Sequence, residues 1–408
     1  MIARLMFIEA RTVRPAKWIR YHGQHVLVRP NVQLRSEDAE MALQTDQNVQ
    51  HITSERPGAG LCKGRLTMAT TILFDPTKPP SPAGRKELDR RLRRLYEAEK
   101  SYDTAKANMA KLAKSSIAGS PVADGEVWVR DAFVFRRDPA PGDGSDRKLP
   151  PKEFWPPAGR LVTPRGSALR FMLIALFEAQ TRTKPGRRPD NPRPLQGEGD
   201  EIGWADLLAT DAKQAGDGRS FMSVPAKKGR HLFSALDLMH AEDLVSLPNV
   251  EERRGKHKGF LLNHEGGKRI SGPNDLYLVP HKADKTYFRL PLGLFTQGWI
   301  HALDDRDLRY LLMLCYFDQG QPDGFQVISR TRYLHMAIGP DTYEKHIWFT
   351  RFDLNDVTLD GARHFNGTVD DYGKGGKAIP HTLKLLREGF DRDGMKVVTT
   401  AIEQQLAR

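Results

Sequence analysis

The sequence predicts an α+β fold, mainly α, in which two similarly built halves follow a long helix. Three observations predict it. An apolar heptad pattern runs over 84–114, two apolar helical segments at 168–177 and 307–316 resemble each other, and a similar series of shorter elements follows each of them. The 408 residues are enough for two or three domains with cores of their own.

The first element is a helix over 84–114. Leu88, Leu95, Tyr102 and Met109 recur every seven residues, a spacing suited to packing against another helix. Its polar positions include a run of basic side chains, namely Arg85, Lys86, Arg90, Arg93 and Arg94. Two interpretations stay open: a helix that forms a homodimer or acts as a basic arm, or a helix that packs on its own domain.

The segments around this helix are less regular. Residues 1–67 are rich in Arg and Gln with weak periodicity, so we expect a disordered leader, or an upstream extension read from an early start codon. Residues 68–158 hold the long helix and two short apolar segments, 127–129 and 133–135, that predict strands. The Pro-rich stretch 138–158 predicts a linker or a domain-bridging loop.

An internal repeat organises the rest of the chain. Leu169-Arg170-Phe171 aligns with Leu308-Arg309-Tyr310, and an apolar run continues in both, so each segment predicts a central core helix. The first is followed by a short helix (202–208), a longer helix (227–242), a strand (244–247), a charged tip (251–258) and a strand (259–262). The second is followed by a short helix (329–337), a left-handed turn at Gly339, a longer helix (341–354), a strand (357–359), a Gly-rich segment, a strand (381–386) and a terminal helix (393–406).

This order of helix, short helix, turn, longer helix, strand, basic loop and strand resembles the winged helix-turn-helix superfamily. The resemblance covers about 165–265 and 289–390 and implies a first winged-helix domain at 159–280 and a second at 281–408. At the level of the fold, the tandem arrangement is similar to that of bacterial plasmid replication initiators and transcriptional regulators. It implies a double-stranded DNA-binding protein that acts in transcription regulation or in DNA replication of a plasmid or mobile element.

The charge agrees with such a partner, because Lys and Arg number 63 against 51 Asp and Glu, a formal net charge of +12. In helix-turn-helix proteins the second helix of the motif enters the major groove, so we expect contacts from the longer helices and from the two basic loops. In the first half these are Lys227, Lys228, Arg230, His231, Arg253, Arg254, Lys256 and Lys258. In the second half they are Arg330, Arg332, Thr342, Tyr343, Lys345, Arg363, Lys374 and Lys377. The alternative for each is solvated surface charge.

The segment 182–193 adds five basic residues, which predict either a further basic arm or a disordered linker. Cysteine usage excludes a disulfide framework and a Cys-based zinc site, because Cys62 and Cys315 lie far apart. No run approaches the ~18 apolar residues of a membrane span. The Gly-rich segment 373–377 lacks the spacing of a phosphate-binding loop. We therefore expect no cofactor, no metal ion and no enzyme activity, and a cytoplasmic, nucleoid-associated protein.

Two other functions stay open. The first is a structural or adaptor protein that uses winged helices to dock partners in a chromosome-organising or defence complex. The second is an enzyme, such as a nuclease, whose active site the sequence does not reveal.

Overall fold

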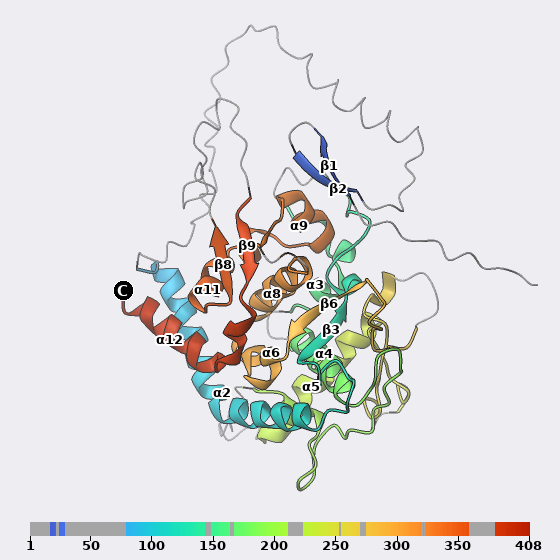
Figure 1. Cartoon of the computed structure of the whole chain (residues 1–408). Coiled ribbons are helices and arrows are strands. Elements are labelled where there is room, and N and C mark those ends of the chain that lie inside the picture. The colour runs from blue at the N-terminus through green and yellow to red at the C-terminus, as the bar shows by residue number, and fades with distance from the viewer. Residues whose placement is uncertain are drawn as a thin grey trace, which may run out of the picture. The chain divides into compact units, whose positions relative to one another are not determined.

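The predicted long helix is present as α2 (Pro82–Lys114), and it packs along its own chain (Figure 1). Ser81 caps its N-terminus by accepting a hydrogen bond from the Gly84 N–H, and Pro82 occupies the first turn, where no intrahelical donor is needed. The heptad residues are buried against α12 (Gly394–Leu406), α6 (Gly293–Thr296) and η3 (Trp204–Leu207). The helix therefore packs within its own chain, on elements of both later halves, which favours the second interpretation. A homodimer through its apolar face finds no support.

The structure is a computed structural model and describes 17–21, 24–28, 79–142, 148–163, 167–210, 223–252, 254–269, 275–319, 321, 323–358 and 380–408. It forms two units, 1–70 and 71–408. In the first unit, β1 (Lys17–Tyr21) pairs antiparallel with β2 (Gln24–Val28), a hairpin that was not predicted. Both segments are rich in β-branched and aromatic residues, which favour strands. The rest of the expected leader lies outside the described residues.

In the second unit, a two-stranded sheet joins segments that are far apart in sequence. β3 (Glu126–Arg130) pairs antiparallel with β6 (Tyr287–Pro291), with Val127 opposite Leu290. β3 was predicted, whereas the strand expected at 133–135 is wrong. The chain there forms the 3₁₀ turn η1 (Asp131–Phe133), because the N–H groups of Val134 and Phe135 both donate to the Asp131 carbonyl at 3.0 and 2.8 Å.

The Pro-rich stretch bridges to the C-terminal half of the chain. It contains η2 (Lys152–Phe154) and α3 (Pro157–Arg160). At its start, the Arg136 and Ala140 N–H groups donate to the carbonyls of His335 and Leu334 at 2.9 and 2.8 Å. Near its end, the Arg309 guanidinium lies 5.4 Å from the centre of the Trp155 ring. These contacts favour the domain-bridging interpretation over a free linker.

The first repeated half begins with α4 (Ala168–Thr181), whose residues are all buried apart from the half-buried Arg170. After η3 comes α5 (Val224–Ala241), and then β4 (Val245–Ser246) pairs antiparallel with β5 (Leu261–Leu262). A further 3₁₀ turn, η4 (Gly267–Arg269), follows. The order of elements is the one predicted, with the short helix realised as a 3₁₀ turn.

The second half is built on α8 (Asp305–Phe317), which the Asp304 carboxylate caps by accepting from the Asp307 N–H at 2.8 Å. The following elements are β7 (Phe325–Gln326), α9 (Ser329–Met336), α10 (Pro340–Tyr343), α11 (His346–Arg351), β8 (Asn355–Thr358) and β9 (Thr382–Leu385). β9 lies between the other two strands, so the sheet order is β7–β9–β8, antiparallel throughout. The neighbouring α7 (Trp299–Ala302) and η6 (Arg387–Asp391) complete the described elements.

Two local predictions in this half are wrong. The single helix expected over 341–354 is divided into α10 and α11, with Glu344 and Lys345 at the break. The left-handed residue is Ala337, with φ 52°, while Gly339 has φ −82°. Ala337 is held in this conformation because the next N–H, that of Ile338, donates to the Arg332 carbonyl at 2.8 Å.

The architecture is therefore α+β and mainly α, as predicted. One cluster of buried apolar side chains runs through both halves, and Phe177 of α4 stacks on Phe295 of α6 with ring centres 4.8 Å apart. The domain boundary at 280/281 stays a prediction. No helix in the described part of the chain has the length and apolarity to cross a bilayer.

Candidate nucleic-acid interface

The outward face of α5 carries the first group of predicted contacts. Ser223 caps the helix by accepting from the Ala226 N–H, and an apolar stripe that includes Leu232, Leu236 and Met239 packs inward. The opposite stripe follows the spacing i, i+3, i+7, i+10 and consists of Lys227, Arg230, Ser234 and Asp237.

The four predicted contacts on α5 differ in exposure. Arg230 is exposed and makes no ion pair within the described part of the chain, whereas Lys227, Lys228 and His231 are half-buried. Burial lowers the pKa of Lys228, and Asp206 partly offsets this. Arg230 is therefore the α5 cation best placed to meet a polyanion.

The loop after α5 is a series of tight turns. In the 247–260 loop, the Asn249 side-chain amide donates to the Lys258 carbonyl at 3.2 Å and ties the two arms together. The tip closes as a turn, in which the Lys258 N–H donates to the Gly255 carbonyl at 2.8 Å. Gly255 has φ +91°, a conformation that glycine accepts without strain, so the chain can reverse there.

The tip of the 247–260 loop folds back onto α5. Lys256 Nζ and His257 Nε2 lie 2.9 and 2.8 Å from Asp237 Oδ1, and the His257 ring stacks on Phe233 with ring centres 4.8 Å apart and planes 5° from parallel. Burial alone would raise the pKa of Asp237, but the bonds from Lys256 and His257 lower it below its ordinary value. Asp237 is therefore ionised at neutral pH.

Two further cations of the loop face solvent. Arg254 and Lys258 are exposed and make no ion pair within the described residues, and Arg253 lies outside those residues. Of the predicted wing contacts, these two are therefore available to a phosphate backbone, and Lys256 already has a carboxylate partner.

In the second half, the predicted contacts Arg332 and Thr342 are buried, and Lys345 is largely covered by other groups of the chain. Lys345 Nζ lies 3.0 Å from both Asp304 Oδ2 and Asp307 Oδ1, with only 15% of its side chain exposed. Arg332 is buried with its guanidinium 3.6 Å from the centre of the Tyr343 ring, and Thr342 is buried as well. In this conformation the three side chains meet groups of the chain itself, and their contact with DNA stays a prediction.

The physical reason for the position of Lys345 is the acidic start of α8. Asp304 and Asp307 form a reciprocal capping box there, and a fully buried carboxylate such as Asp307 requires cations beside it. Lys345 supplies one from the break between α10 and α11. Tyr343 is half-buried, Arg330 is exposed, and Arg363, Lys374 and Lys377 lie outside the described residues.

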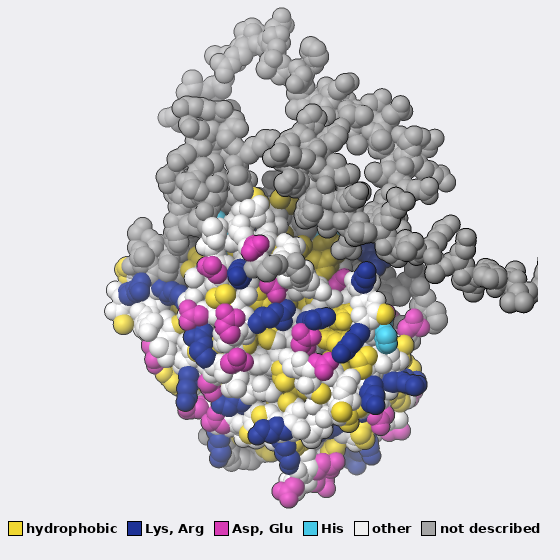
Figure 2. Space-filling view, viewed as in Figure 1, with side chains coloured by type: hydrophobic (Ala, Val, Ile, Leu, Met, Phe, Trp, Pro, Cys, Tyr) yellow, Lys and Arg dark blue, Asp and Glu magenta, His cyan; other side chains and the backbone are white. Residues whose placement is uncertain are grey.

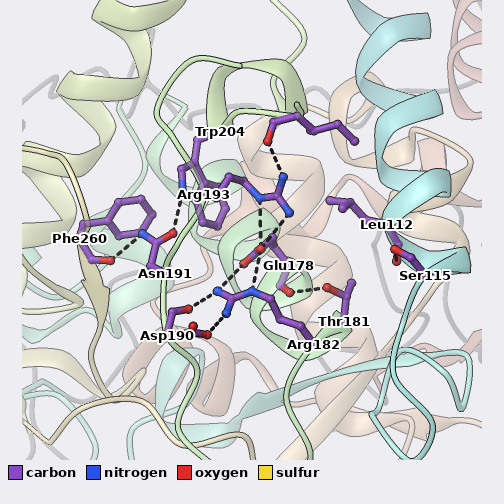
Figure 3. A network of polar contacts seen from close by, with 11 residues as sticks. Leu112, Ser115, Glu178, Thr181, Arg182, Asp190, Asn191, Arg193, Trp204 and Phe260 are labelled. Atoms are coloured by element: carbon purple, nitrogen blue, oxygen red, sulfur yellow. Dashed lines mark hydrogen bonds and ion pairs between the residues drawn. The ribbon is translucent and has the colours of Figure 1, made fainter. Parts of the chain in front are cut away.

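The basic segment 182–193 is fastened to α4 (Figure 3). Arg182 Nε and Arg193 Nε donate to the buried Glu178 carboxylate at 2.9 and 3.1 Å, and Arg182 also pairs with Asp190. Asn191 then links the two ends of the first half, because it accepts from Trp204 Nε1 at 3.0 Å and donates to the Phe260 carbonyl at 2.7 Å. Neither a basic arm nor a disordered linker describes this segment.

Sequence reasoning missed Asp237 and the buried ion pair between Arg91 of α2 and Asp307 of α8, in which Nη2 lies 2.6 Å from Oδ2. The position of Asp237, seven residues after Arg230 on one helical face, was a usable signal, since i, i+3, i+7 spacing groups outward residues. The spacing Asp304-x-x-Asp307 was another, because it predicts a capping box. On the face seen in Figure 2, Lys and Arg side chains are interspersed with Asp and Glu and do not gather in one patch.

Comparison with known proteins finds no match: no protein-family model, no curated protein and no solved structure matches the chain.

Proposed function

We propose that the chain binds double-stranded DNA through two winged-helix modules, and that α5 and the 247–260 loop of the first module make the main contact. The observation that carries this proposal is the order of elements around β9. Helix α8, strand β7, helices α9 to α11 and strands β8 and β9 follow one another, and the sheet order is β7–β9–β8. A helical trio closed by a small antiparallel sheet is the arrangement expected of a winged helix.

The internal repeat supports two modules of one kind. The aligned arginines Arg170 and Arg309 are alike in that each donates to backbone carbonyls of a short helix, Arg170 to one in the other half and Arg309 to one in its own half. Arg170 reaches the carbonyls of Ile300 and Leu303 around α7 at 2.7 and 3.0 Å. Arg309 reaches those of Met336 and Ala337 at the end of α9, the first at 3.0 Å. A guanidinium is suited to both places, since the last carbonyls of a helix have no intrahelical partner.

The first module is assigned the main contact because its cations are exposed. Arg230 on α5 and the pair Arg254 and Lys258 on the loop present positive charge from two adjacent elements. A helix fits the major groove, where Arg230 would meet base edges, and the loop would follow the flanking phosphates. Transcription regulation, or replication initiation on a plasmid or mobile element, is the cellular role that we propose for such a binder.

The test is binding to a fluorescent random-sequence duplex as a function of salt between about 50 and 200 mM. We expect the wild type to bind with a steep salt dependence. A variant carrying Lys227→Ala, Arg230→Ala, Arg254→Ala and Lys258→Ala should bind at least about tenfold more weakly. Its salt slope should be flatter by roughly 0.9 for each phosphate that the protein no longer neutralises.

The matched control removes the same charge elsewhere. Lys86, Arg90, Arg93 and Arg94 are exposed on α2, and their substitution by Ala should change affinity far less. An equal weakening in the control would remove α5 and its loop from the interface. A wild type that leaves the duplex unbound at micromolar protein and low salt would overturn the proposal and favour a protein-docking role.

A further inference from the structure

Asp237 places a carboxylate on the face of α5 that carries Arg230. Its side chain is 49% exposed, so it is not there to fill the core. A negative charge at this position repels phosphate, and its removal would by itself strengthen DNA binding. Its contacts with the 247–260 loop indicate a different role.

Three contacts join the tip of the loop to α5 at this point. Lys256 and His257 are the central residues of the turn closed by Gly255 and Lys258, and both bind Asp237 Oδ1. The stacking of His257 on Phe233 adds a third contact from the preceding helical turn. The residues that flank this anchored pair, Arg254 and Lys258, remain exposed. The turn is thus held to α5 through Lys256 and His257, while the cations on either side of this pair remain in solvent.

We propose that Asp237 is a positioning residue of the DNA-binding surface: it anchors the 255–258 turn to α5 and so fixes Arg254 and Lys258 relative to Arg230. The inference rests on the proposed function. A loop that is already held in place loses less conformational entropy when it meets DNA, so anchoring raises affinity without adding a contact. Asp237 therefore contributes through the loop cations and does not touch DNA itself.

The decisive variant is Asp237→Asn, because electrostatics and anchoring predict opposite signs for it. Removal of one negative charge alone would tighten binding to the random duplex. Removal of the anchor weakens it, and we expect a weakening of about threefold to tenfold together with a flatter salt slope, since the loop cations leave the phosphates. A variant that merely lowered the fraction of folded protein would leave the slope unchanged.

Two controls complete the binding test. Glu251→Gln removes an exposed carboxylate from the same loop, and it should bind as tightly as the wild type or more tightly. Lys256→Gln should weaken binding, and the double variant with Asp237→Asn should be less than additive, because both substitutions break the same ion pair. An Asp237→Asn variant that binds as well as or better than the wild type overturns the inference.

A measurement without DNA separates this inference from the proposed function. Trypsin cleaves segments that can open locally, and Lys256 is held against α5 by Asp237, so cleavage after Lys256 in the folded Asp237→Asn protein should be several-fold faster than in the wild type. Equal cleavage rates would show that Asp237 does not hold the loop. Faster cleavage in a protein that binds no duplex would uphold the anchor while overturning the proposed function.

Discussion

Arg91 on α2 and Asp307 on α8 form a buried ion pair, with Arg91 Nη2 2.6 Å from Asp307 Oδ2. The exposed fractions of the two side chains are 8% and 0%. Burial acts to lower the pKa of Arg91, but Asp307 and Asp304 outweigh it and raise this pKa. Lys345 completes the cluster by pairing with both carboxylates. The opposite charges of this cluster hold α2, the start of α8 and the α10–α11 break together.

Arg91→Leu should therefore be strongly destabilising. It leaves Asp307 with Lys345 as its remaining cation, and removal of one partner of a buried ion pair costs about 3–5 kcal/mol. Urea unfolding monitored by circular dichroism measures the effect. The neighbouring Arg90→Leu, at an exposed position of the same helix, should stay within about 0.5 kcal/mol of the wild type. A destabilisation below about 1 kcal/mol for Arg91→Leu would show that the pair is hydrated in solution.

Glu178→Gln should loosen the segment 182–199. The neutral amide cannot form charge-assisted bonds with both Arg182 and Arg193, and we expect a destabilisation of about 2–4 kcal/mol. Limited proteolysis reports the local effect as faster cleavage after Arg187 and Arg188. The same change at an exposed position of the segment, Glu198→Gln, leaves both cleavage sites intact and serves as the control. An unchanged cleavage rate in Glu178→Gln would contradict the role assigned to the carboxylate.

Asp305 predicts a pH dependence of stability. Burial raises the pKa of its carboxyl from 3.8 to about 6, with a smaller opposing effect from Arg170. The folded state then binds the proton more tightly than the unfolded chain. Proton binding at Asp305 therefore stabilises the fold fully below pH 4, and this stabilisation is lost as the pH rises through about 6.

Asp305→Asn removes this loss of stability at higher pH. The variant should be more stable than the wild type by about 1 kcal/mol at pH 8, because the favourable position of a carboxylate at a helix start offsets part of the burial effect. At pH 4 the difference should vanish. Urea midpoints at the two pH values measure it, with Asp89→Asn on the exposed face of α2 as the control. Equal midpoints at pH 8 would indicate a fully hydrated carboxylate.

Periodicity and capping predicted most helices, because these signals are local. The buried residues of α2 recur at the heptad positions read from the sequence, and α4 is buried around nearly its whole circumference, as its apolar composition indicated. Local signals failed where a distant segment decides the conformation. The left-handed residue is Ala337 because Arg332 and Arg309 bind the backbone around it. The break before α11 coincides with Lys345 turning toward Asp304 and Asp307.

The same division applies to the candidate interface. Residue types and charge predicted cations on α5 and on the loop after it, and Arg230, Arg254 and Lys258 are exposed there. Nothing in the sequence separated Lys345 and Arg332 from these cations, yet Arg332 is buried and only 15% of the Lys345 side chain is exposed. The difference between an exposed cation and a buried one lies in its neighbours, and a one-dimensional pattern does not contain them.

By itself, the sequence determined the class of fold, the succession of elements and the positive charge, since each depends on composition or on spacing within one segment. Only the tertiary structure decided which charges stay in solvent, which carboxylates they meet and where the 247–260 loop lies on α5. These outcomes depend on contacts between residues as far apart as Arg91 and Asp307, whose electrostatic interaction arises only when folding removes the water between them.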